Sequence, residues 1–244
     1  MVKAMLRYIK SFLELLYPEK NICQICNSYE ESINDTYICK SCLSKLEKIE
    51  LPVCKVCNKS LSHNPDLIIC DECVREPRSF EMSKSLFYYK GIAKKLIHDY
   101  KYCGKTYYYK LFAYLLVQYM KEINYKDFDY IISVPLHKIK LRKRGYNQSK
   151  LLAGKIGKYF NIPYIDALKR INNTKKQSNL SRYSRQKNLQ NAFALTSNKM
   201  SELIAGADIL IIDDIFTTGA TVNECSKILK LHGANKVFVL TLAR

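Results

Sequence analysis

The stretch Ile209–Thr221, ILIIDDIFTTGAT, constrains the fold of this chain more than any other segment. The four apolar residues at its start predict a short buried strand. Two carboxylates, Asp213 and Asp214, come next, and the small and hydroxyl residues 217–221 predict a loop. The amphipathic run Val222–Leu231 then predicts a helix. This order is typical of an open α/β sheet, in which ligands lie beyond the carboxyl ends of the strands.

The chemistry of this segment predicts a site for a sugar phosphate. A helix that begins after a loop of small residues offers free N–H groups and a partial positive charge to a phosphate. The loop hydroxyls can add hydrogen bonds, and the two carboxylates suit sugar hydroxyls or a hydrated divalent cation. The segment lacks the lysine of a Walker loop. The simpler alternative is an ordinary turn in which the acidic residues only cap the helix.

Eight of the ten cysteines form an internal duplication of four CxxC pairs. Each cysteine of the first half recurs 31 residues later, and twelve residues separate the two pairs within each half. A CxxC turn places two thiolates on one side of a tetrahedral ion, and a second CxxC turn completes the site. We therefore predict two structural zinc ions, since each half has too few apolar residues to fold without metal. The ligands are Cys23, Cys26, Cys39, Cys42, Cys54, Cys57, Cys70 and Cys73.

The spacing leaves the grouping of these ligands open. Sequential tetrads, 23/26/39/42 and 54/57/70/73, are favoured because each half is complete, while the interleaved tetrads 23/26/54/57 and 39/42/70/73 remain an alternative. Disulfides are disfavoured because no signal peptide is apparent. Cys103 and Cys225 stand outside the pattern in apolar helical surroundings, and we expect both in the core.

The net charge of +18 is concentrated in one part of the chain. Residues 131–190 contain fifteen Lys or Arg and one acid, a net of +14. This concentration predicts an anionic partner, either pyrophosphate, nucleic acid or both. Residues 1–20 predict an amphipathic helix with a basic polar face, whose charges exclude a transmembrane segment. Its packing on the protein itself is favoured over peripheral membrane attachment, and both remain open.

Strands and helices are expected to alternate after residue 77. Strands are predicted at 85–89, 130–134, 209–212 and 237–242, and helices at 92–102, 107–123 and 148–160. Such alternation predicts a parallel sheet. Residues 171–191 are polar and lack periodicity, which indicates a mobile loop. The predicted organisation is a helix at 1–20, a cysteine-rich module at 21–77 and an α/β domain at 78–244.

Two further segments carry residues suited to a diphosphate. In the run Ser133–Ala153, cationic side chains follow a strand, namely Lys138, Arg142 and Arg144. Gly145 lets the chain turn, and Asn147 can cap the next helix. In the other segment, 98–105, Lys101 is a candidate for the diphosphate or for a structural role, and Gly104 fits the residue after a helix.

The segment Ile209–Thr221 resembles the phosphoribosyl pyrophosphate motif of type I phosphoribosyltransferases. Together with the cysteine pairs and the run RGYNQS, Arg144–Ser149, it makes the chain similar to the ComF family. The resemblance implies a type I phosphoribosyltransferase-like parallel sheet flanked by helices, with a small N-terminal double zinc ribbon. It also implies that phosphoribosyl pyrophosphate binds with magnesium. By resemblance, Asp213 and Asp214 bind the ribose hydroxyls, and Arg185, in a loop that closes over the substrate, meets the leaving pyrophosphate. The implied 5′-phosphate ligands are Thr217, Thr218, Gly219, Ala220 and Thr221.

The same resemblance implies a cytoplasmic protein that acts in DNA uptake during natural competence. Its implied partners are single-stranded DNA and the helicase and import machinery of competence. A nucleic-acid-handling protein that keeps the fold without turnover is the main alternative, and the +14 stretch favours it. A nucleobase-salvage phosphoribosyltransferase is a weaker alternative. Whether transfer is catalysed is left open by the sequence.

Overall fold

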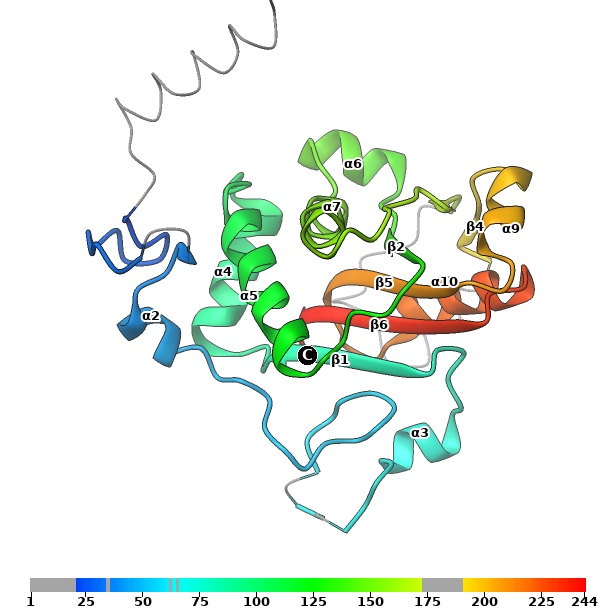
Figure 1. Ribbon diagram of the computed structural model, residues 1–244, viewed down its shortest axis with the longest axis horizontal. Coiled ribbons are helices and arrows are strands. Elements are labelled where there is room, and N and C mark those ends of the chain that lie inside the picture. The colour runs from blue at the N-terminus through cyan, green and yellow to red at the C-terminus, as the bar shows by residue number, and fades with distance from the viewer. Residues whose placement is uncertain (1–20, 34–35, 62, 65, 173–190) are drawn as a thin grey trace, which may run out of the picture. The chain divides into compact units, whose positions relative to one another are not determined.

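The computed structural model describes residues 21–33, 36–61, 63–64, 66–172 and 191–244 (Figure 1). The predicted helix at 1–20 lies outside these ranges, as does most of the predicted loop at 171–191, with Arg185. Within them, no helix is long and apolar enough to cross a membrane. The helices are α2 (Lys40–Ser44), α3 (Asp71–Arg75), α4 (Gly91–Tyr102), α5 (Tyr108–Glu122), α6 (Lys138–Arg144), α7 (Gln148–Phe160), α9 (Asn198–Ile204) and α10 (Ala220–Leu231). The strands are β1 (Met82–Phe87), β2 (Tyr130–Ser133), β3 (Leu168–Arg170), β4 (Phe193–Leu195), β5 (Asp208–Ile215) and β6 (Lys236–Ala243).

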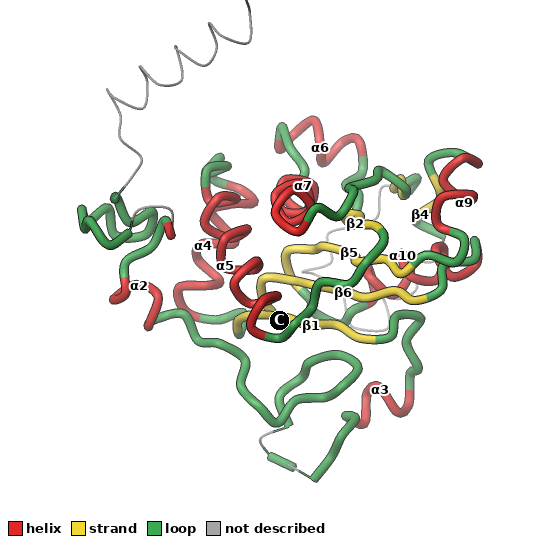
Figure 2. Tube along the Cα trace, in the orientation of Figure 1, coloured by secondary structure: helices red, strands yellow, loops and turns green. Residues whose placement is uncertain are grey.

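The predicted parallel sheet is present and has four strands in the order β1-β6-β5-β2 (Figure 2). All three pairings are parallel, and Asp213 of β5 lies opposite Thr241 of β6. The apolar run Ile209–Ile212 is fully buried, as expected for a central strand covered on both faces. β3 and β4 form a separate antiparallel pair.

Helices cover both faces of this sheet. α7 packs on β2 and β5 and against α5, while α10 packs on β6 and lies on the opposite face (Figure 1). α7 has the predicted bounds, and Asn147 caps it by accepting hydrogen bonds from the N–H groups of Ser149, at 3.0 Å, and Lys150. Gly145 ends the preceding helix with a φ of 82°. The predictions of a turn and a cap at these two positions are confirmed.

Several boundaries differ from those predicted. β5 continues beyond the apolar run to Ile215, because its ladder with the long strand β6 persists, so Asp213 and Asp214 belong to the strand. Ala220 and Thr221 lie in the first turn of α10 and not in the loop. α6 occupies a segment where no helix was expected, because none of its residues is buried and no apolar face marks it.

The first strand and one cysteine also differ from expectation. β1 is Met82–Phe87, earlier in the chain than the predicted strand at 85–89. The expectation that Cys103 is a core residue is wrong, whereas Cys225 is fully buried. Cys103 is exposed because it ends α4, where the chain turns away through Gly104 at a φ of 69°. Gly104 does occupy the predicted position after the helix.

By its internal contacts the chain forms two compact units, Met1–Leu46 and Glu47–Arg244. Each unit contains one half of the cysteine duplication, and the two halves repeat the same local hydrogen bonds. Asn27 N–H donates to the carbonyl of Cys23 and Asn58 N–H to that of Cys54, both at 2.9 Å. Both asparagines have a positive φ, near 60°, which this side chain tolerates better than most.

Candidate functional site

The acidic pair lies at the carboxyl end of β5, and its two side chains contact different helices. Asp213 Oδ1 accepts hydrogen bonds from the Ser149 hydroxyl of α7, at 3.0 Å, and from the N–H of Asp214, at 2.9 Å. Asp214 Oδ1 lies 2.7 Å from the Nζ of Lys101 in α4. Only 11% of the Asp214 side chain and 15% of the Lys101 side chain are exposed. This ion pair is therefore largely shielded from solvent and bridges α4 to the sheet.

Burial and the nearest opposite charge have opposite effects on the pKa values of Asp213 and Lys101. Burial, with the charge of Asp214, raises the pKa of Asp213 to about 7, and Lys101 only partly offsets this rise. Burial alone would lower the pKa of Lys101, but the contact with Asp214 outweighs it and the pKa is raised. The lysine thus stays charged at neutral pH, while Asp213 is divided between its protonated and ionised forms. A cation at this site would favour the ionised form.

The loop after β5 leads directly into the N-terminus of α10. Gly219 occupies the position before the helix with a φ of 75°, a conformation that side chains with a Cβ rarely adopt. A Cβ at Gly219 would also lie 2.4 Å from the ring of Phe216, so the ring leaves no room for a side chain. Gly219 has no side chain that could cap the helix, and the N–H of Ala220 donates to the Thr218 hydroxyl at 3.4 Å. A helix N-terminus that follows a turn of small residues is the kind of site that binds phosphates.

The basic helix α6 follows β2, whose carboxyl end is next to that of β5 in the parallel sheet. Lys138, Arg142 and Arg144, the three cations predicted to meet a diphosphate, all lie on this helix. The guanidinium of Arg144 stacks over the ring of Tyr102 at 5.0 Å, and this tyrosine is 65% exposed. The structure thus groups cationic and aromatic side chains near the edge of the sheet that holds the acidic pair.

The run RGYNQS connects α6 and α7 to the helix that carries Lys101. The Tyr146 hydroxyl donates to the carbonyl of Tyr100, and the Tyr100 hydroxyl donates to the carbonyl of Gln148 at 3.0 Å. Their rings are also in contact, with centroids 5.8 Å apart. Tyr146 therefore contacts α4 both through its ring and through its hydroxyl. These contacts fix the backbone immediately before Lys101 and before Ser149, the two residues that contact the acidic pair.

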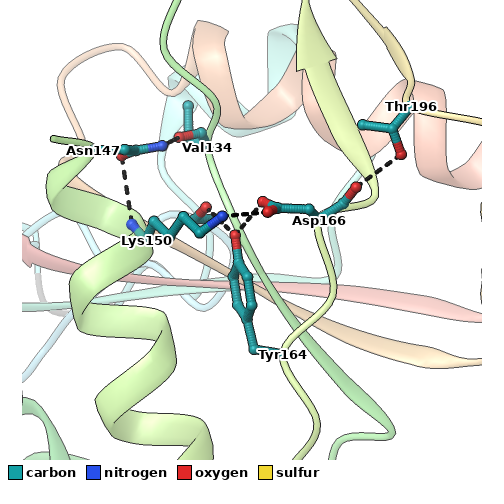
Figure 3. A network of polar contacts seen from close by, with 7 residues as sticks. Val134, Asn147, Lys150, Tyr164, Asp166 and Thr196 are labelled. Carbon is teal, nitrogen blue, oxygen red and sulfur yellow. Dashed lines mark hydrogen bonds and ion pairs between the residues drawn. The ribbon is translucent and has the colours of Figure 1, made fainter. Parts of the chain in front are cut away.

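A second network fixes the start of α7 (Figure 3). Asn147 donates through Nδ2 to the carbonyl of Val134 at 3.0 Å, next to the end of β2. Lys150 and the Tyr164 hydroxyl both bind the carboxylate of Asp166, and Thr196 donates to its carbonyl at 2.8 Å. The single acid of the basic stretch is thus used to position α7. Because residues 131–190 contain no other acid, this stretch offers no acidic side chain to balance the positive charge of α6.

The cysteines form two sequential tetrads, and the interleaved alternative is not observed. The sulfur atoms of Cys23, Cys26, Cys39 and Cys42 lie within 4.8 Å of one another, as do those of Cys54, Cys57, Cys70 and Cys73. Cys26 and Cys39 Sγ are 3.8 Å apart, and Cys57 and Cys70 Sγ are 3.7 Å apart. A regular tetrahedron with Zn–S bonds of about 2.3 Å has edges of about 3.8 Å. The tetrads therefore fit zinc, and these separations are far longer than a disulfide bond.

An open hollow of about 530 Å³ lies away from the acidic pair. It is lined by residues of β4 and α9 and by His232, which ends α10. Gly219 begins the same helix, so the hollow and the phosphate-type loop lie at opposite ends of α10. The chemistry favours the loop, where carboxylates and helix N–H groups occur together.

Sequence reasoning missed some contacts of this site. Ser149 was part of a recognised run but had no assigned role, and Lys101 was a candidate either for the diphosphate or for a structural role, with no partner named, whereas it contacts Asp214. Both contacts join residues more than sixty positions apart, which a pattern along the chain does not reveal. For Lys101, the available signal in the sequence was its position three residues before Gly104, where the chain turns after α4. The predicted ligand roles of Asp213, Asp214 and residues 217–221 stay predictions.

Comparison with known proteins gives the domain content of the chain. Residues 12–74 match the family described as double zinc ribbon domain, and residues 147–244 match the phosphoribosyl transferase domain. The predicted resemblance to the ComF family is confirmed. The fold prediction is also confirmed, and two structural zinc ions are supported by the tetrads and the ribbon domain together.

Several proteins with established names are similar to this chain. Competence protein F of Haemophilus influenzae is 38% identical over 115 residues, which are 47% of this chain and 49% of that protein. DNA utilization protein YhgH of Escherichia coli K12 is 38% identical over 118 residues, 48% of this chain and 49% of that protein. Competence protein ComFC of Streptococcus pneumoniae is 29% identical over 161 residues, 66% of this chain and 67% of that protein. The chain thus spans about half the length of the first two relatives.

Solved structures of phosphoribosyltransferases show a remote similarity. One is a hypoxanthine phosphoribosyltransferase from Staphylococcus aureus, with a TM-score of 0.30 and 16% identity over 61% of this chain and 62% of that chain.

Proposed function

We propose that this protein binds phosphoribosyl pyrophosphate with magnesium and uses it in the handling of DNA during natural competence. The observation that carries the proposal is the joint placement of Asp213 and Asp214 with the Gly219 loop at the start of α10. A ribose 5-phosphate needs both hydroxyl acceptors and a phosphate site. The names of the relatives, which refer to competence and DNA utilization, support the biological setting. The free cysteines fit a reducing compartment such as the cytoplasm.

In this proposal each part of the site binds a different part of the ligand. The N–H groups at the start of α10 bind the 5′-phosphate. The carboxylates accept hydrogen bonds from the ribose hydroxyls and hold water of the magnesium ion. The cations of α6, with Arg185, neutralise the pyrophosphate. Lys101 orients Asp214 through their ion pair and acts as a positioning residue.

Calorimetry on the zinc-loaded protein tests the binding claim. We expect binding of phosphoribosyl pyrophosphate with magnesium, and weaker binding when magnesium is omitted. Ribose 5-phosphate should bind more weakly than the pyrophosphate, because it leaves the α6 cations without a partner. No binding at millimolar ligand in the presence of magnesium would refute the proposal.

A second candidate function is the binding of single-stranded nucleic acid. The exposed helix α6 supports it, since its cations alternate with exposed Ile139 and Leu141 and lie beside Tyr102. Phosphate contacts release counterions, so DNA affinity should fall steeply with salt, while aromatic stacking adds affinity for single strands. Affinity that is the same at low and moderate salt would argue against this function. The two functions are compatible, because one ligand-binding protein can also bind DNA.

A nucleobase-salvage enzyme remains the weaker alternative, since the zinc ribbons and the names of the relatives do not point to it. Incubation with phosphoribosyl pyrophosphate and each common nucleobase tests it. Release of pyrophosphate that depends on a nucleobase would favour salvage over the proposed function.

A further inference from the structure

Arg244 connects the second cysteine tetrad to the loop that begins α10. Its guanidinium donates through Nη1 to the carbonyl of Cys57, and its Cζ lies 5.0 Å from the centroid of the Phe216 ring. Its backbone extends the ladder between β6 and β1, because its N–H donates to Phe87 O at 3.0 Å and its carbonyl accepts from Tyr89 N–H at 2.7 Å. The side chain therefore projects from a well-fixed backbone between a zinc ligand and an aromatic ring.

Phe216 lies between Arg244 and Gly219 of the loop. Its ring is 2% exposed, packs edge-on against Phe80 at 6.1 Å, and fills the space where a side chain at Gly219 would lie. Its N–H donates to the carbonyl of Ala243 at 2.8 Å, so its backbone is fixed by the residue before Arg244. The position of this ring therefore determines where the chain can turn into α10.

The second tetrad is part of the same packed region. Its four cysteines belong to a single cluster of buried residues that also contains Phe80 and Phe216. The Asn58 side chain accepts from the N–H of Ser85 in β1 at 2.6 Å. In the segment that follows the tetrad, the N–H of Ser79 donates to the Asn223 side chain in α10 at 2.8 Å. The second tetrad and the segment after it thus contact the sheet, the loop and the helix.

We propose that Arg244 is a positioning residue through which zinc at the second tetrad stabilises the ligand-ready conformation of residues 216–221. Zinc fixes the Cys54–Cys57 turn, the turn fixes the Arg244 guanidinium, and the guanidinium holds Phe216 under Gly219. The expected effect on ligand binding rests on the proposed function, whereas the expected effect on the order of the loop does not. The tetrad Cys23/Cys26/Cys39/Cys42 belongs to the other unit and provides a matched control.

Hydrogen exchange of the ligand-free protein tests the mechanical claim directly. In Arg244→Ala, loss of a charged hydrogen bond should speed amide exchange of residues 216–221 by about tenfold, while the protein keeps two zinc ions. Affinity for phosphoribosyl pyrophosphate should fall about fivefold or more. Arg244→Lys, which keeps a cation over the ring, should lie between Ala and wild type. Lys236→Ala, an exposed position at the other end of β6, should match wild type.

The two tetrads are then compared. Cys42→Ser and Cys73→Ser should each lower zinc by one ion per chain, but only Cys73→Ser should speed exchange of the loop. Wild-type loop exchange in Arg244→Ala would overturn the proposal, even if Cys73→Ser unfolds. Equal loosening in Cys42→Ser would overturn it as well. If Arg244→Ala loosens the loop but wild type binds no ligand, the proposed function fails and this inference stands.

Discussion

Lys101 forms a largely buried ion pair with Asp214. Removing one partner of a buried ion pair leaves the other charge uncompensated, which costs about 3–5 kcal/mol of unfolding free energy. We expect Lys101→Met to lose stability of this order in chemical denaturation. Lys105→Met, which breaks the more exposed pair with Asp99 in the same region, should change stability little. Equal effects of the two substitutions would contradict a special role for the Lys101–Asp214 pair.

Because the pKa of Asp213 is raised, we expect protein stability and ligand affinity to change in opposite directions with pH. This raised pKa, about 7, means that the folded protein holds a proton that the unfolded chain releases near pH 4. Stability should therefore fall as pH rises from about 4 to about 7. Binding that needs the carboxylate should strengthen about tenfold between pH 6 and pH 8.

Calorimetry at pH 6, 7 and 8 measures the binding effect, and Asp213→Asn is the control. The ligand's own phosphates titrate equally with both proteins, so only wild type should show the additional strengthening. A parallel pH profile for the two proteins would show that Asp213 does not titrate in the binding reaction.

Among the secondary-structure elements, the β5–α10 turn depends most on one glycine. Gly219 and Gly206 share a φ of 75°, but only Gly219 faces a ring that blocks a side chain. Both Gly→Ala changes should cost about 1–2 kcal/mol of stability from backbone strain, and Gly219→Ala should cost more because its Cβ would meet the Phe216 ring. Only Gly219→Ala should also weaken phosphoribosyl pyrophosphate binding, by about tenfold or more. Equal ligand affinity of the two variants in calorimetry would argue that the loop does not bind the phosphate.

The elements that the sequence predicts well are those whose signal is local. The bounds of α7, the Asn147 cap and the turn at Gly145 follow from apolar periodicity and from side chains within three residues. The short helix α6 could not be predicted in this way, because it buries no face. β5 was predicted too short because its last residues are ordered by pairing with β6 and not by their own hydrophobicity.

For the candidate site, the sequence indicated the acidic pair and the loop but not their surroundings. The contact of Lys101 with Asp214 and that of Arg244 with Cys57 join residues that only the sheet topology brings together. The grouping of the cysteines into sequential tetrads was favoured by the duplication, and the sulfur positions agree with it. The packing of the second tetrad beside Phe216 had no counterpart in the local pattern.

At the level of the complete chain, the two tetrads predict two zinc ions per protein. Elemental analysis should give this stoichiometry, and a reductant should not change it, because the cysteines are free thiols or metal ligands. Chelation should unfold the described part of Met1–Leu46, since metal supplies much of the folding energy of such small modules. The sheet within Glu47–Arg244 should survive but lose order around β1. One zinc per chain would contradict the double ribbon.

The most direct test of the ligand site is the double substitution Asp213→Asn/Asp214→Asn, measured by calorimetry with phosphoribosyl pyrophosphate and magnesium. Asparagine keeps the shape and also caps helices well, so an acidic pair with only a capping role should tolerate the change. If the carboxylates bind the ribose and magnesium, affinity should fall about tenfold or more, because charged hydrogen bonds contribute about 1.5–3 kcal/mol. Asp127→Asn/Glu202→Gln, which removes two exposed acids elsewhere, should bind like wild type. Wild-type affinity in the Asp213/Asp214 variant would contradict the assignment of the site.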